Sequence, residues 1–209
     1  MHTFFIVSSL SSLLPFIAAL FCFRWLNRDL KIFFVLFVVA VSVDLSTLYI
    51  RIFTNEINVW LFHIYTLIEF TILITLFIRW QSNRLVKKVM TANLPFFVIV
   101  WILCKIHLES WTQLDNFTVS IESVLLIGAS TITLYQLNSE NNVISFTDYR
   151  FLISTGVLIY FGCNLFIFGV GNLIDVWPIH SAINILCNIL YFAVFICRHP
   201  KLRFSGFSY

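Results

Sequence analysis

Charged residues are scarce in this sequence. Only 11% of its 209 residues are Asp, Glu, Lys or Arg, whereas about a quarter of an average soluble domain is charged. Hydrophobic residues make up 60% of the chain and the mean hydropathy is +0.93. This composition excludes an ordinary soluble enzyme, a disordered chain and a nucleic-acid-binding module. It predicts an all-α protein that spans a membrane several times.

Motifs that carry common chemistries are also missing. The sequence contains no CxxC, GxSxG, HExxH or P-loop motif. Its last apolar stretch has no lysine that could hold retinal as a Schiff base, and no motif in the sequence identifies a cofactor. The five cysteines lie in or beside apolar runs, where packing is the expected role of a thiol: Cys22, Cys104, Cys163, Cys187 and Cys197.

Apolar stretches occupy most of the chain and are joined by short loops. Seven of them are long enough to cross about 30 Å of hydrocarbon, and they run near 4–23, 31–53, 58–78, 89–107, 116–137, 151–172 and 177–197. Backbone groups in lipid must find hydrogen-bond partners within their own segment, so each stretch is predicted to be a helix. The sequence therefore predicts one domain over residues 1–209, an integral membrane bundle of seven transmembrane helices.

Basic residues predict the orientation of this bundle. Only Arg51 and Lys105 fall on one side. The other eleven of the 13 Lys and Arg residues fall on the opposite side: Arg24, Arg28, Lys31, Arg79, Arg84, Lys87, Lys88, Arg150, Arg198, Lys201 and Arg203. The positive-inside rule then places the N-terminus outside and the C-terminus in the cytoplasm, as expected for a protein of a bacterial cytoplasmic membrane.

A short motif occurs twice and indicates an internal repeat. Trp60 and His63 open the third stretch as Trp177 and His180 open the seventh, each pair with Trp-x-x-His spacing. With 6 Trp and 5 His in 209 residues, chance predicts about 0.14 such pairs. A weaker similarity relates the first and fifth stretches. We therefore expect a 3+1+3 plan with parallel repeats at about 4–78 and 116–197, joined by a linker helix at about 89–107.

This architecture is similar to that of the SWEET sugar transporters and of microbial rhodopsins, although the sequence lacks their motifs. The segments 63–70 and 179–188 resemble a group of small seven-helix bacterial membrane proteins. That resemblance covers the whole chain and implies a seven-helix fold, but no activity.

Three acids stand inside apolar stretches, where each costs roughly 2.5–3.5 kcal/mol on insertion scales. They are Asp44, Glu69 and Glu122. Such residues usually face the bundle interior or a wet cavity, so they are candidate functional residues. Counting 1.5 Å per residue places them, with the other polar residues of the spans, in the outer half of the membrane or near its middle.

Histidines and asparagines extend this polar set. His180, Asn184 and Asn188 recur every four residues and form one face of the last span, which requires a polar surface opposite it. With His63 and Asn164, these residues and the three acids are predicted to line one axial pocket that is open to the outside. The simpler alternative is that the asparagines only join helices and that the histidines only anchor the interface.

Three functions fit this set. The first is binding and transport of a small solute, driven or accompanied by protons. The second is a ligand-sensing or accessory subunit that works with a membrane or cytoplasmic partner protein. The third is an intramembrane enzyme in which His63 and His180 bind a metal or a haem. The sequence favours the first, with the lipid bilayer and a small solute as partners and no nucleic acid.

Overall fold

The computed structural model describes residues 2–54, 59–112, 115–140, 148–170 and 177–196, and the regular elements in this part of the chain are all helices. The helices are α1 (His2–Ser11), α2 (Leu13–Cys22), the 3-10 turn η1 (Phe23–Trp25), α3 (Arg28–Thr54), α4 (Val59–Trp80), α5 (Arg84–His107), α6 (Asn116–Glu140), α7 (Tyr149–Val170) and α8 (Trp177–Ile196). Asn58, Asp175 and the basic residues at 198, 201 and 203 lie outside the described residues.

Seven helical segments of the described chain are long and apolar enough to cross a membrane. They are Ile6–Trp25, Arg28–Ile50, Val59–Trp80, Arg84–His107, Asn116–Glu140, Tyr149–Ile167 and Pro178–Ile196. Each segment overlaps one predicted stretch, so the all-α class and the presence of seven helices long and apolar enough to span a membrane are confirmed. Long apolar runs can bury their backbone polar groups only as helices, which is why composition alone located them.

The first span is interrupted at Ser12, between α1 and α2. Pro15 cannot donate a backbone hydrogen bond and crowds the carbonyl of Ser11, yet Pro95 is accommodated inside α5 without a break. The difference at Ser12 is local competition for the backbone. The Ser11 hydroxyl donates to the carbonyl of Ser8 at 2.6 Å, and Ser12 Oγ lies 2.8 Å from the carbonyl of Ser9.

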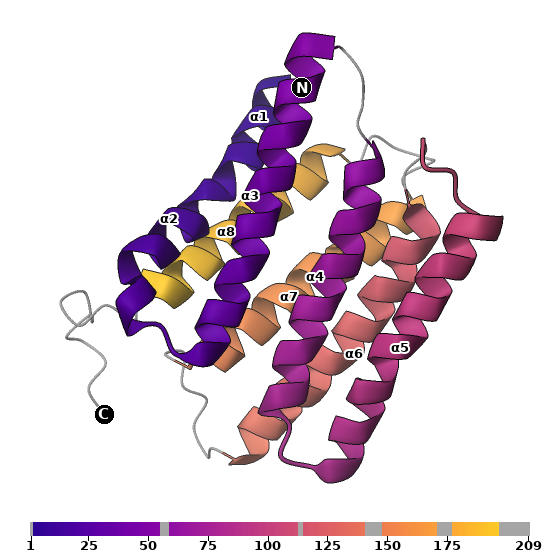
Figure 1. Ribbon diagram of the computed structural model, residues 1–209. Coiled ribbons are helices and arrows are strands. Elements are labelled where there is room, and N and C mark those ends of the chain that lie inside the picture. Colours follow the sequence, from indigo (N-terminus) through magenta and orange to yellow (C-terminus); the bar gives the residue numbers. More distant parts are fainter. Residues whose placement is uncertain (1, 55–58, 113–114, 141–147, 171–176, 197–209) are drawn as a thin grey trace.

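Six of the spans form a closed ring in which each helix packs on the next. Its order is the first span (α1 and α2), α3, α4, α6, α7 and α8, and α8 returns to α1 and α2. The remaining span, α5, packs on α4 and α6 at the edge of the bundle and is the least buried of the seven (Figure 1). Helices of the ring carry Glu69, Glu122, Asn164 and His180, which are described below.

An aromatic cluster fills the ring near the first turns of α3. Phe33 and Phe37 of α3 meet Tyr191 and Phe195 of α8, with ring centroids 5.1–5.9 Å apart. All four side chains are at most 9% exposed. Gly156 of α7 allows this packing, because a Cβ atom there would lie 2.5 Å from Cε1 of Tyr191. The cluster therefore packs α3 against α8 in this half of the bundle.

A polar network ties the helix ends next to this cluster. Asp29, in the first turn of α3, accepts hydrogen bonds from Arg79 Nε at 2.7 Å, from Trp80 Nε1 at 3.0 Å and from the Tyr149 hydroxyl at 3.3 Å. These donors lie at the end of α4 and the start of α7. One carboxylate thus joins three helices, and the Asn27 side chain caps α3 beside it by accepting from Leu30 N at 2.9 Å.

Candidate functional site: buried carboxyl groups inside the ring

Two acids from neighbouring helices form the centre of the candidate site. Glu69 of α4 is 9% exposed and accepts a hydrogen bond from the Tyr65 hydroxyl, one helical turn away, at 3.0 Å. Glu122 of α6 is 1% exposed, and its Oε1 has no hydrogen-bond partner among the described residues. Glu69 and Asp115 lie close enough to Glu122 for their charges to act on it. Three carboxyl groups thus share one region.

Asp115 is the acid that the sequence pattern missed. It directly precedes α6 and lies just outside the predicted stretch 116–137, yet it is only 5% exposed. It accepts a hydrogen bond from Thr66 Oγ1 at 2.8 Å, and its Oδ2 lies 3.9 Å from Nδ1 of the fully buried His63. Its spacing from Glu122 is i, i+7, which puts both on one face of a helix extended by one residue, and this signal could have identified it.

The connection between α5 and α6 covers His63. The Trp111 ring lies 5.4 Å from the imidazole, and Trp101 Nε1 donates to the carbonyl oxygen of His63 at 3.0 Å. Trp101 and Trp111 also contact each other edge to face, at 6.0 Å between centroids. His63 is therefore enclosed by aromatic side chains and faces an acid, rather than anchoring the helix at a wet interface.

A buried ion pair stands beside this region and accounts for one of the two basic residues on the sparsely charged side. Lys105 Nζ lies 2.6 Å from Glu109 Oε2, and the two side chains are 4% and 6% exposed. Thr118 donates its backbone N–H to Glu109 Oε1 at 2.8 Å and its hydroxyl to Oε2 at 2.6 Å. Burial alone would raise the pKa of Glu109, but the bonds from Lys105 and Thr118 hold it below its ordinary value.

Helices α7 and α8 contribute Asn164 and His180. Asn164 is 4% exposed, and its Oδ1 has no hydrogen-bond partner in the described part of the chain. The half-buried His180 lies against Tyr160, with ring centroids 6.2 Å apart, and Tyr160 is within electrostatic range of both Glu69 and Glu122. Tyr160 thus links this side of the ring to the two glutamates.

The two asparagines of α8 face the first span instead. Asn184 Nδ2 donates to Ser8 Oγ at 3.0 Å, and Asn188 Nδ2 donates to Ser11 Oγ at 2.8 Å. The predicted polar surface opposite the α8 stripe is therefore present, and it consists of the α1 serines. These contacts match the simpler alternative, in which the asparagines hold two helices together.

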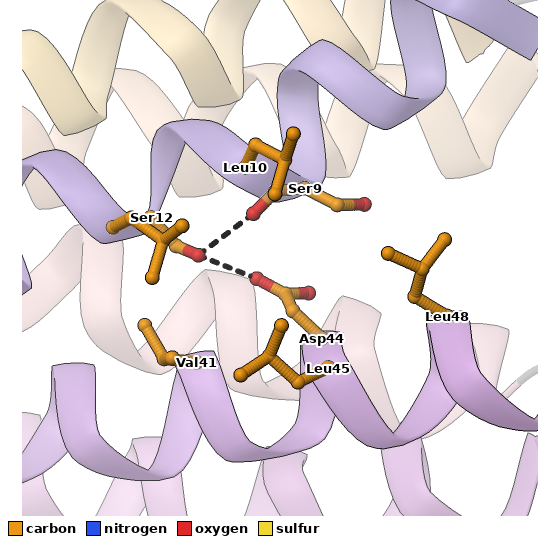
Figure 2. Close-up of a pocket in the computed structure, with 8 residues that line it drawn as sticks. Ser9, Leu10, Ser12, Val41, Asp44, Leu45 and Leu48 are labelled. Carbon is orange, nitrogen blue, oxygen red and sulfur yellow. Dashed lines mark hydrogen bonds between the residues drawn. The ribbon is translucent and has the colours of Figure 1, made fainter.

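Asp44 lies in a separate groove between the first span and α3. Its Oδ2 is 2.8 Å from Ser12 Oγ, and Figure 2 shows the carboxyl group pointing from α3 toward the junction of α1 and α2. The groove has room for about one water molecule. It is lined by Ser9, Leu10, Ser12, Leu13, Val41, Asp44, Leu45 and Leu48. The predicted pocket residues thus divide into a central group, a helix-joining pair and this groove.

No three His, Cys, Asp or Glu side chains among the described residues are placed to hold a metal ion. His63 and His180 contact different partners, Asp115 and Trp111 in one case and Tyr160 in the other. No protein-family model matches the chain, and neither does any curated protein or solved structure. The function is therefore argued from the geometry of the site.

Proposed function

We propose that this membrane protein binds protons, together with or in exchange for a small solute, at a central site formed by Glu69 and Glu122, and that it transports them. The observation that carries the proposal is Glu122: a carboxyl group that is 1% exposed, whose Oε1 lacks a hydrogen-bond partner in the described chain. A buried ionised carboxylate is costly unless it is paired, so such a group takes up a proton or a cationic ligand.

The surroundings of Glu122 support this proposal. The charges that act on it, those of Glu69 and Asp115, have the same sign, and Lys105 is paired with Glu109. Like charges that share a buried site favour uptake of a proton by one of them. The Tyr65 hydroxyl on Glu69 and the open amide oxygen of Asn164 supply further polar groups around the pair.

The order of the ring supports the proposed parallel repeat. A two-fold axis along the membrane normal would exchange the first span with α6, α3 with α7, and α4 with α8. Under this exchange each neighbouring pair in the ring maps onto another neighbouring pair, and α5 is left outside as the linker. In our proposal the N-terminus is outside and the C-terminus is in the cytoplasm, as the basic residues predict.

The aromatic cluster favours a second candidate. Phe33, Phe37, Tyr191 and Phe195 pack closely between α3 and α8 in the half of the bundle near Asp29, so a ligand that leaves the central site along α3 and α8 must displace them. A ligand-sensing subunit needs only the central site and a partner protein, whereas a transporter must also open a path through this half of the bundle. The two candidates differ in whether binding is followed by passage across the membrane.

Reconstitution into lipid vesicles tests the proposal, with a pH-sensitive dye trapped inside and an imposed pH gradient. We expect the native protein to move protons and Glu122→Gln to reduce the rate at least tenfold. The matched control is Glu140→Gln, an exposed acid at the end of the same helix, which should keep the native rate. Native mass spectrometry of the purified protein identifies any solute that remains bound.

Proton movement that is equal in the native protein and in Glu122→Gln would overturn the assigned site. Proton binding or solute binding without movement across vesicles would overturn transport and select the sensing candidate. If Glu140→Gln also lost proton binding and proton movement, the effect of Glu122→Gln would not be specific to Glu122. The support for a dedicated site would then be removed.

A further inference from the structure

The junction of α1 and α2 contains a hydroxyl group with too few protons for its contacts. Ser12 Oγ lies 2.8 Å from the carbonyl oxygen of Ser9 and 2.8 Å from Oδ2 of Asp44 (Figure 2). Both are hydrogen-bond distances between oxygens. A serine hydroxyl has one proton, and a carbonyl oxygen can only accept.

The proton of Ser12 is needed by Ser9. α1 ends at Ser11, so the carbonyl of Ser9 belongs to the last turn, where helical partners are missing. Leaving such a carbonyl unsatisfied in apolar surroundings costs several kcal/mol on transfer scales. When Ser12 donates to Ser9, the remaining contact to Asp44 joins two oxygens that both lack a proton unless the carboxyl group supplies one.

We infer that Asp44 is a proton-binding site: its neutral carboxyl group donates to Ser12 Oγ, and Ser12 donates to the carbonyl of Ser9. This inference does not depend on the role proposed for Glu69 and Glu122. It assigns a chain of two hydrogen bonds that starts on α3 and ends on the last turn of α1.

The charges around Asp44 agree with a neutral group. The first span offers only the serines Ser9 and Ser12, and the rest of the groove lining is apolar. From α4, Tyr65 is the titratable residue close enough to interact with Asp44. Within the described residues, no Lys, Arg or His lines this groove, so nothing there compensates an ionised carboxylate.

A second hydroxyl in the structure provides a contrast. Thr66 Oγ1 lies 3.0 Å from the carbonyl of Phe62 and 2.8 Å from Asp115 Oδ2. Phe62 lies within the continuous helix α4, where its carbonyl can accept the helical hydrogen bond of residue i+4. The Thr66 proton is therefore available to Asp115, and this pair needs no second proton.

The groove beside Asp44 is small. It has room for about one water molecule next to the carboxyl group. Transfer of the Asp44 proton to a water molecule there would leave a carboxylate and a hydronium ion. The carboxylate then attracts the Ser12 proton, and the Ser9 carbonyl loses its donor. Release of the proton thus weakens the α1–α2 junction.

Infrared difference spectroscopy of the protein in lipid vesicles tests this inference through the carbonyl stretch of protonated carboxylic acids. At neutral pH we expect Asp44→Asn to remove the intensity of one protonated carboxyl group. Ser12→Ala should shift that band to higher frequency, because it removes the hydrogen-bond acceptor. The control is Asp29→Asn on the same helix, whose native carboxylate is paired with Arg79 and should contribute nothing to the band.

An unchanged band in Asp44→Asn would overturn the inference. If that variant does not fold, Ser12→Ala still decides, because a band that keeps its native frequency shows that no protonated carboxyl donates to Ser12. Glu122→Gln removes a different carboxyl group, so loss of proton movement in that variant with the Asp44 band intact separates the two proposals.

Discussion

Replacing Gly156 by alanine tests how closely α7 and α8 pack. An added Cβ atom would lie 2.5 Å from Cε1 of Tyr191 and 2.8 Å from both Cζ and the hydroxyl oxygen. The ring cannot easily retreat, because Phe33 contacts it at 5.1 Å between centroids and Phe37 at 5.8 Å. Relief therefore requires a shift of the helix or of the whole aromatic cluster.

Gly162, on the same helix, is a matched control. A Cβ atom there meets nothing within 4 Å, so Gly162→Ala changes only the backbone preference of the helix. That preference contributes equally to both variants and cancels when they are compared. The difference between Gly156→Ala and Gly162→Ala is therefore the overpacking penalty, about 1–3 kcal/mol.

Thermal unfolding of the detergent-solubilised protein measures this difference. For a chain of this size, about 1–3 kcal/mol corresponds to a midpoint lower by roughly 2–12 °C in Gly156→Ala than in Gly162→Ala. Introducing Tyr191→Leu should remove most of the gap, because the ring atoms that the new Cβ meets are gone. Equal midpoints for the two alanine variants would refute the close packing of α7 on α8.

Three further predictions concern polar contacts, each measured by thermal unfolding. A double-mutant cycle of Asn188→Leu and Ser11→Ala should give a coupling energy of about 0.5–1.7 kcal/mol. A coupling energy of zero would contradict the hydrogen bond between α8 and α1. Glu109→Gln should cost about 3 kcal/mol or more at pH 7, since it leaves Lys105 buried without its partner. Because the folded pKa of Glu109 lies below the ordinary 4.5, that loss should shrink as pH falls through the folded pKa. Asp29→Asn should cost about 1.5–3 kcal/mol, and a native midpoint would contradict its role in joining three helices.

The spans were predictable because lipid imposes one requirement on every residue of a stretch. Each backbone group needs a partner within its own segment, so length and composition suffice to place a helix. The break at Ser12 depends instead on which of several acceptors a hydroxyl group reaches. The sequence contains Pro15 and Pro95 in similar apolar surroundings, and only the first lies beside a break.

The candidate site was predictable only in part, for a related reason. The cost of an acid in the membrane identified Asp44, Glu69 and Glu122 one residue at a time. Which of them meet depends on the order of helices around the ring, which no residue pattern encodes. Asp115 was missed because its position in the sequence belongs to a loop, whereas its side chain lies inside the bundle next to His63.

Glu122 and Glu109 should respond in opposite ways to the same chemical change. Glu109 is held by a cation and by two groups of Thr118, so neutralising it removes favourable contacts. Glu122 faces charges of its own sign and has an oxygen without a hydrogen bond in the described chain. Neutralising Glu122 therefore removes an unfavourable charge interaction. We expect the unfolding midpoint of Glu122→Gln to equal or exceed that of the native protein, although the variant no longer moves protons across vesicles.

That combination is typical of a residue retained for function at the expense of stability. A loss of more than about 1 kcal/mol in Glu122→Gln, the average effect of a point mutation, would instead make Glu122 a structural contact. Unfolding midpoints of the two glutamine variants, measured side by side in one detergent at pH 7, compare a paired buried acid with an unpaired one in the same protein. A lower midpoint for Glu122→Gln than for Glu109→Gln would refute the assignment of the central site.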